Sequence, residues 1–177
     1  MIDNIEEEFS KTVLMFPRKR LDMDYLYQYY LGKIEEYRDR GPDGVKGVIR
    51  AMQDGISFAK HGGRVPVSTG VKELFDTQGY VKRSQVVYEH KTPLSTYRKE
   101  IDRFFFTDPE KFWNLLWEKT NLHLVTQEED KRLRENKLSR SLPKDGSDRY
   151  EVASITVSDL TLNIEDVKMP LKNKKNI

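Results

Sequence analysis

The sequence predicts an α+β protein, and three observations lead to that prediction. Apolar and aromatic residues recur at helical spacing through the first third of the chain. A short run of β-branched and aromatic residues at 86–88 has the composition of a strand. A second apolar alternation, at 122–125, runs directly into a helix-initiating pattern. Helices are therefore expected first, then a strand–strand–helix unit, then a further strand segment.

The composition limits the size and class of the protein. The chain has 177 residues, of which 31 are Lys or Arg and 29 are Asp or Glu, for a net charge of +2. This length suits one compact domain with appendages, and 11% aromatic residues are more than disordered chains usually carry. The absence of cysteine excludes disulfides, thiolate zinc sites and a cysteine nucleophile. No apolar run reaches the roughly 20 residues that span a bilayer, and the acidic start differs from a signal peptide, so a cytoplasmic protein without a membrane partner is expected.

Three helices are expected in the first third of the chain. Helical spacing of apolar residues predicts them at 5–16, 24–38 and 45–60. The aromatic stripe of the second helix is interpreted as core. The third helix ends at Gly62 and Gly63 in the manner of a glycine C-cap. The glycines of the first third lack the order of a nucleotide-binding loop and are interpreted as turns.

The first predicted strand ends in a carboxylate and an imidazole. Glu89 and His90 stand side by side there, and Pro93 follows. Neighbouring side chains on a regular strand project to opposite faces, so these two converge only if the chain bends. Pro93 favours a bend because it restricts the preceding residue to extended conformations and has no N–H for a sheet ladder.

Two helix starts lie on either side of the second strand. Asp108, followed by a proline, predicts the N-cap of an amphipathic helix that packs on the core. After the strand at 122–125, Thr126 and Glu129 have the spacing of a capping box, so a helix is expected to begin at Thr126. Asp130 then lies in its first turn, where the helix dipole keeps a carboxylate ionised and ready to hold a cation.

Taken together, these residues resemble the HNH nuclease motif, the ββα-metal or His-Me finger. The matching segments are Glu89-His90 with Pro93-Leu94, Asn121-Leu122-x-Leu-Val-Thr and x-Glu-Glu-Asp-Lys-x-x-Leu, within 81–138 and so under half of the chain. In that family the first His ends one strand, an Asn lies before or at the second strand, and the last His or Asn lies on the following helix. The resemblance implies a ββα-metal core.

The resemblance also implies roles for four residues. His90 would be the general base, Glu89 and Asp130 would ligate a metal ion, and Asn121 would orient His90 or its loop. Imidazole titrates near neutral pH and can therefore deprotonate the attacking water. A divalent cation offsets the charge that gathers on the phosphate and the leaving oxygen, and two carboxylates favour Mg²⁺ or Mn²⁺ over zinc.

Three features depart from the family pattern. Asp130 stands where the family commonly has His or Asn, and it would ligate with a full charge. Asn121 follows His90 by 31 residues, a long interval that holds an aromatic insertion. Without cysteine there is no structural zinc, so the core must take over that role.

Each residue taken alone also has an ordinary structural interpretation. His90 fits a hydrogen-bonded surface histidine, Glu89 a solvated carboxylate, Asp130 a helix-start residue and Asn121 a turn former. Their joint order favours the nuclease interpretation. His123 alternates with leucines, is expected to point away from the apolar face, and is the second choice of base.

Basic residues on both sides of the predicted site are expected to contact nucleic acid. They follow the predicted base or lie on the predicted metal helix: Lys91, Arg98, Lys99, Lys131, Arg132 and Arg134. Phosphate contacts give sequence-independent affinity that falls with salt, and a solvated helix face is the alternative. The expected partner is duplex or branched DNA.

The predicted organisation has three parts. They are a helical N-terminal region at 1–70, an HNH-like ββα-metal core at 71–145, and a C-terminal strand segment with a basic tail at 146–177. In the last part, a turn at 144–148 precedes one or two strands at 150–163, with Asp159 marking a break.

The resemblance implies a metal-dependent endonuclease that hydrolyses DNA phosphodiester bonds, of a phage or mobile-element type. The alternative is a non-catalytic nucleic-acid-binding or protein-interaction module that retains the fold. A third hypothesis is an RNA-directed nuclease.

Overall fold

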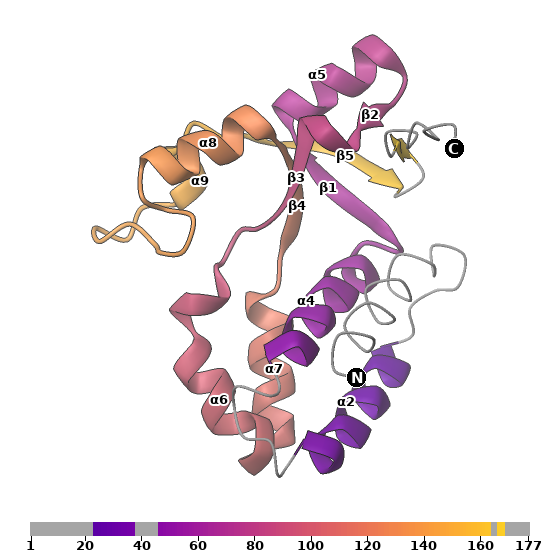
Figure 1. Cartoon of the computed structure of the whole chain (residues 1–177), viewed down its shortest axis with the longest axis vertical. Coiled ribbons are helices and arrows are strands. Elements are labelled where there is room, and N and C mark those ends of the chain that lie inside the picture. Colours follow the sequence, from indigo (N-terminus) through magenta and orange to yellow (C-terminus); the bar gives the residue numbers. More distant parts are fainter. Residues whose placement is uncertain (1–22, 38–45, 164–165, 169–177) are drawn as a thin grey trace, which may run out of the picture.

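A computed structural model describes residues 23–37, 46–163 and 166–168 of the protein. These residues form a mixed four-stranded sheet with helices around it and a group of four helices beside it (Figure 1). The predicted α+β class is confirmed. No helix in these ranges is long and apolar enough to cross a membrane. The helix predicted at 5–16 and most of the basic tail lie outside the described residues.

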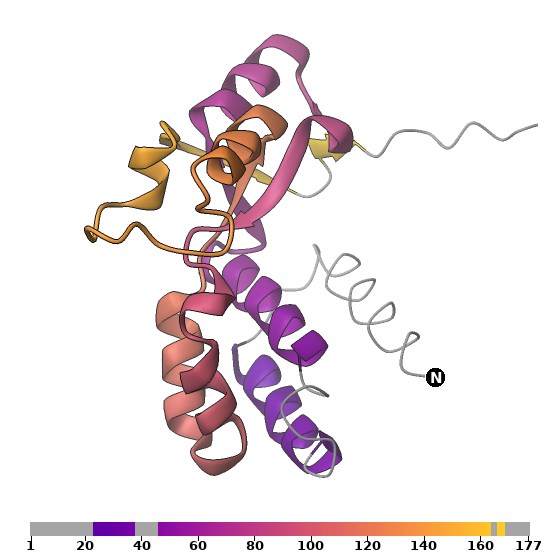
Figure 2. The same cartoon turned by 60° about the vertical axis from the view of Figure 1, so that its left-hand side comes forward.

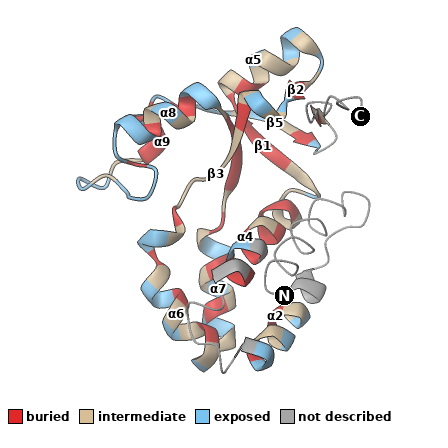
Figure 3. Cartoon of the chain, in the orientation of Figure 1, coloured by how far each residue is buried: buried red, intermediate tan, exposed pale blue. Residues whose placement is uncertain are grey.

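The sheet has the strand order β3–β4–β1–β5. Its strands are β1 (Arg64–Ser68), β3 (Val86–His90), β4 (Leu122–Thr126) and β5 (Val157–Asn163). β4 pairs antiparallel with β3 and parallel with β1, while β5 runs antiparallel to β1. A separate parallel pair joins β2 (Val81–Lys82) to β6 (Val167–Lys168). The central strands β1 and β4 are buried along almost their whole length (Figure 3).

The four helices beside the sheet come from two separate parts of the chain. They are α2 (Met23–Tyr37), α4 (Lys46–Lys60), α6 (Arg98–Thr107) and α7 (Pro109–Lys119). Their shared core is aromatic: Tyr30 stacks on Phe112 with ring centroids 4.4 Å apart, and Phe105 meets Tyr30 edge-on at 5.4 Å. The long interval between His90 and Asn121 is therefore a helical hairpin that completes this second core (Figure 2).

Three further helices pack on the sheet. α5 (Thr69–Gln78) follows β1, α8 (Gln127–Glu135) follows β4, and the single turn α9 (Arg149–Val152) precedes β5. Because β1 and β4 are parallel neighbours, the N-termini of α5 and α8 lie close together. The buried Glu129 carboxylate joins them, since it accepts from Ser68 Oγ at 2.5 Å and from the Thr126 N–H at 2.7 Å. Gly70 leaves room for it: a Cβ at that position would lie 3.0 Å from Glu129 Oε1.

The predicted helix boundaries are confirmed where local capping determines them. Asp108 caps α7, with its side chain accepting from the backbone of Lys111. Thr126 and Glu129 form the expected capping box of α8. α4 ends in a turn at 61–63, in which Gly62 and Gly63 take positive φ.

The strand prediction for 150–163 is wrong in its first part. Asp148 accepts a hydrogen bond from the Tyr150 N–H at 2.8 Å and so caps a helical turn, which places Tyr150 in α9. β5 continues through Asp159, but its pairing with β1 shifts register between Thr161 and Val157, so an irregularity of the ladder falls around this residue. The hydrophobic clusters also cross the predicted divisions, since α6 and α7 share a core with α2 and α4.

Candidate functional site

The strand–strand–helix order expected from the sequence is formed by β3, β4 and α8. In the antiparallel pair, Glu89 lies opposite His123 and His90 lies opposite Leu122. α8 starts directly after β4 and packs against both strands. Glu89, at the end of β3, and Asp130, in the first turn of α8, therefore belong to elements in direct contact.

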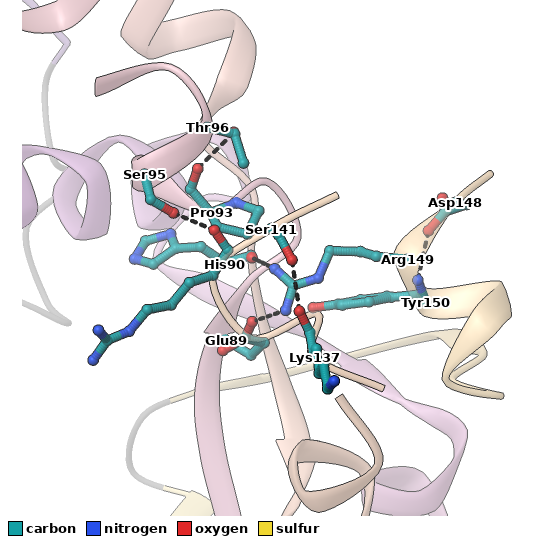
Figure 4. Close-up of polar contacts among 11 residues, drawn as sticks. Glu89, His90, Pro93, Ser95, Thr96, Lys137, Ser141, Asp148, Arg149 and Tyr150 are labelled. Carbon is teal, nitrogen blue, oxygen red and sulfur yellow. Dashed lines mark hydrogen bonds and ion pairs between the residues drawn. The ribbon is translucent and has the colours of Figure 1, made fainter. Parts of the chain in front are cut away.

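Glu89 and His90 project to opposite faces of β3, as a regular strand dictates. The Glu89 carboxylate pairs with the guanidinium of Arg149. The His90 ring is turned away from that carboxylate (Figure 4), and its Nε2 lies 3.2 Å from Oδ1 of Asp54 on α4. The turn before Pro93 begins only after β3 has ended, so it does not bring the two side chains together.

A buried arginine outside the predicted site holds the end of β3. Arg149 is 1% exposed. Its Nη2 donates to Oε1 of Glu89, and its Nη1 donates to the carbonyl oxygen of His90 at 3.0 Å (Figure 4). One side chain thus fixes both the carboxylate and the main chain of the predicted catalytic dipeptide. The only signal in the sequence is the N-cap pattern at Asp148, which does not reveal a partner 60 residues away.

The residues that flank this arginine continue the pairing. Asp148 forms an ion pair with Lys91, the residue after His90. The Lys91 ammonium also lies 5.6 Å from the ring centroid of Tyr150. Residues 148–150 therefore contact residues 89–91 through charges and an aromatic ring.

The charges around Glu89 oppose one another. Burial raises the pKa of the Glu89 carboxyl, the Arg149 guanidinium works against that rise, and the Asp130 carboxylate adds to it. The negative charge of Asp130 thus disfavours the charged form of Glu89. Asp130 has its own partner, since Arg134 Nη2 lies 3.2 Å from its Oδ2. Each carboxylate is therefore neutralised by an arginine.

Three buried polar atoms near Glu89 have no hydrogen-bond partner in the described structure: Arg149 Nε, Tyr150 Oη and His123 Nδ1. The His123 ring lies against Tyr150, with centroids 5.5 Å apart. Burial lowers the pKa of His123 to about 4, and the nearby Lys91 adds to the effect. His123 points away from the face of Leu122 and Leu124, as expected, but it is buried there because β4 is covered on both faces.

Asn121 supports the loop after His90 through its main chain. Its carbonyl oxygen accepts from the Lys91 N–H at 2.8 Å, just beyond the pair of His90 and Leu122 where β3 ends and β4 begins. The resemblance implies that Asn121 orients His90 or its loop, and this contact acts on the loop.

The cations predicted to contact phosphate mostly have partners within the protein. Lys91 pairs with Asp148, Arg98 with Asp102, Lys131 with Glu128 and Glu135, and Arg134 with Asp130, while Arg132 donates to the carbonyl oxygens of Ala153 and Ser154. Lys99 is exposed on α6. The ion pairs on α8 are exposed and therefore weak, but Arg132 has a structural role at the end of α9.

A basic loop lies on the same side of the sheet as α8 and α9. Lys137, Arg140 and Lys144, in the segment 136–147, are exposed and have no acidic partner among the described residues (Figure 3). Ser95 Oγ donates to the carbonyl oxygen of Arg140 at 2.5 Å, which holds this loop beside the turn that follows His90. We call Lys137, Arg140 and Lys144 the basic loop.

The donor set at Glu89 and Asp130 suits a hard cation. Mg²⁺ commonly takes one or two carboxylates from a protein and completes its shell with water and phosphate oxygens. In the ranges that the structure describes, no three His, Asp or Glu side chains are arranged to hold a metal ion. Glu89 and Asp130 would therefore be the two ligands that the protein supplies. Arg149 neutralises one of them.

Comparison of the chain with protein-family models, with curated proteins and with solved structures found no match. A functional assignment therefore depends on the geometry of the site.

Proposed function

We propose that the protein is a metal-dependent endonuclease of the HNH type that hydrolyses DNA phosphodiester bonds. The observation that carries this proposal is the β3–β4–α8 unit, which places Glu89 at the end of β3 and Asp130 in the first turn of α8, on elements in direct contact, with His90 as the next residue of the strand. Carboxylates on two contacting elements are the ligands that a hard divalent cation accepts from a protein. Both are partly exposed, at 16% and 17% of their side-chain surface.

In this proposal the two carboxylates would hold Mg²⁺ or Mn²⁺, and His90 would accept the proton of the attacking water. Because Glu89 and His90 lie on opposite faces of β3, the proposal requires the end of this strand to rearrange before both act on one phosphate. The bound cation supplies positive charge against the phosphate and the leaving oxygen. With Nε2–H of His90 donating to Asp54, Nδ1 is the nitrogen left to accept a proton, and it has no partner in the described structure. Asp54 stabilises the imidazolium that forms. Because Nδ1 is buried, water reaches it only when the covering residues move.

DNA in this proposal contacts the basic loop. The loop is tied to the turn after His90 through Ser95, so a phosphate backbone lying along it passes the predicted base. Its cations are not neutralised by neighbouring acids, unlike Lys131 and Arg134 on α8. Contacts of this kind are to phosphate and give no sequence specificity.

Incubation of supercoiled plasmid with the protein and Mg²⁺ or Mn²⁺, with EDTA as the control, tests the proposal. His90→Ala should lower the cleavage rate by roughly 10²–10⁴-fold because the general base is lost. His61→Ala is the matched control, because His61 lies in the turn after α4. This variant should cleave DNA at the rate of the wild type. Unchanged turnover in His90→Ala would remove His90 from the mechanism. A wild type that never cuts with either metal would refute the nuclease.

A second candidate is a non-catalytic nucleic-acid-binding module that retains the fold. The observation that favours it is the Arg149–Glu89 pair, in which a buried guanidinium already neutralises the carboxylate. This candidate predicts DNA affinity that is the same in EDTA and in Mg²⁺, with no cleavage in either.

A further inference from the structure

The cation beside Glu89 in this structure is a side chain of the protein itself. Arg149 and Glu89 form an ion pair in which the arginine side chain is 1% exposed and the carboxylate 16%. An ion pair this far from water depends on its geometry, because each charge left alone would be poorly solvated. Glu89 therefore needs a positive partner, and Arg149 provides it.

A divalent cation on the same carboxylate would face that guanidinium. Two positive charges within a few ångströms of each other repel strongly in a partly buried site. Arg149 also donates to the His90 carbonyl oxygen, so it cannot swing away from Glu89 without releasing the main chain at the end of β3. Metal binding at Glu89 would therefore work against the Arg149 contact.

The segment that carries Arg149 is small and locally held. α9 is a single turn that follows the loop 136–147, which is largely exposed apart from the buried Leu138. Arg132 on α8 holds its far end by donating to the carbonyl oxygens of Ala153 and Ser154, at 2.8 Å and 3.0 Å. α9 is not part of the sheet, but Tyr150 and Ala153 are buried in a cluster with Val125 of β4 and Leu133 of α8, so displacing the turn disturbs that packing and not the strand pairing.

We infer that Arg149 is a positioning residue that holds Glu89 and the His90 main chain in the metal-free protein and competes with a divalent cation for Glu89. The inference rests on the proposed function, because it takes Glu89 as a metal ligand. It predicts that the metal binds more tightly when the guanidinium is removed. If Arg149 were purely structural, removing its guanidinium would weaken Mn²⁺ binding or leave it unchanged.

Calorimetric titration of Mn²⁺ into the full chain tests this order of affinities. Arg149→Met should bind Mn²⁺ at least roughly tenfold more tightly than the wild type, and Arg149→Lys should lie between them because it keeps one charge. Arg132→Met is the matched control: it loosens the same turn without touching an acid and should bind Mn²⁺ like the wild type. Equal affinities in the wild type and both Arg149 variants would overturn the inference, as would the absence of Mn²⁺ binding in all of them.

Hydrogen exchange on the wild-type protein keeps the inference testable if Arg149→Met does not fold. Saturating Mn²⁺ should speed the exchange of the amides at 152–155, whose hydrogen bonds hold α9 and the turn after it, and leave α4 unchanged. Unchanged or slower exchange at 152–155 in the presence of bound Mn²⁺ would also overturn it.

The two proposals can fail separately. Metal-dependent plasmid cleavage together with equal Mn²⁺ affinities would refute the role of Arg149 and keep the nuclease. Tighter Mn²⁺ binding by Arg149→Met with no cleavage by any variant would refute the nuclease and keep the competition.

Discussion

Acidification should destabilise the protein through His123. Burial in β4 lowers the pKa of this imidazole to about 4, against the usual value of about 6.5 in an unfolded chain. The folded state therefore disfavours the charged form, so the unfolded state takes up the proton first as the pH falls. The contribution of His123 is fully present above about pH 6.5 and is lost as the pH falls towards 4. For these two pKa values the loss is about 2 kcal/mol at pH 5 and roughly 3 kcal/mol once both states are protonated.

Urea denaturation at about pH 7.5 and about pH 5, followed by tryptophan fluorescence, measures this effect. The free energy of unfolding of the wild type should fall by about 2 kcal/mol more than that of His123→Leu, whatever the other groups contribute to both. Tyr97→Phe is the control, because it alters another buried ring that does not titrate in this range. If the wild type and His123→Leu lose the same free energy between the two pH values, the buried, neutral imidazole is not the cause.

Two other predictions concern the helix junction and the basic loop. Gly70→Ala should lower the free energy of unfolding by about 1 kcal/mol in urea denaturation, because its Cβ would press on the Glu129 carboxylate that Ser68 holds. Gly32→Ala is the control: this position in α2 has open space around it, so the free energy of unfolding should rise by roughly 0.5–1 kcal/mol. A stabilised Gly70→Ala would show that the carboxylate yields easily. We expect a shallower slope of log K for DNA binding against log salt, by roughly two to three units in Ca²⁺, when Lys137, Arg140 and Lys144 are together replaced by Gln. The control is the same replacement at Lys72, Lys111 and Lys119, which should leave the slope unchanged. An unchanged slope would place the DNA elsewhere.

Helix boundaries were predictable from the sequence because capping acts over four residues. Asp108 and the Thr126–Glu129 pair each satisfy backbone groups of their own helix, so the sequence contains both partners of each hydrogen bond. The same reasoning located Asp130 in the first turn of α8. The strand ending at His90 followed from its β-branched and aromatic composition.

The surroundings of the candidate site were not predictable in this way. β1 lies at the centre of the sheet, directly after a helical region. The sequence does not predict this strand, because a strand that is buried on both faces has no alternation of polar and apolar residues. The burial of His123 is hidden from the sequence for the same reason, since alternation with leucines gives the face of a side chain but does not show whether that face is covered.

The sequence by itself determined the α+β class, the capped helices and the order of Glu89, His90, Asn121 and Asp130 along a strand, a strand and a helix. All of these depend on residues close to one another in the chain. Only the tertiary structure decided which charges meet, and it brought Arg149 to Glu89 and Asp54 to His90 across 60 and 36 residues of chain. Such pairs leave no pattern in the sequence, because a salt bridge requires only that two side chains be adjacent in the fold. The packing of β3, α4 and α9 brings these side chains together.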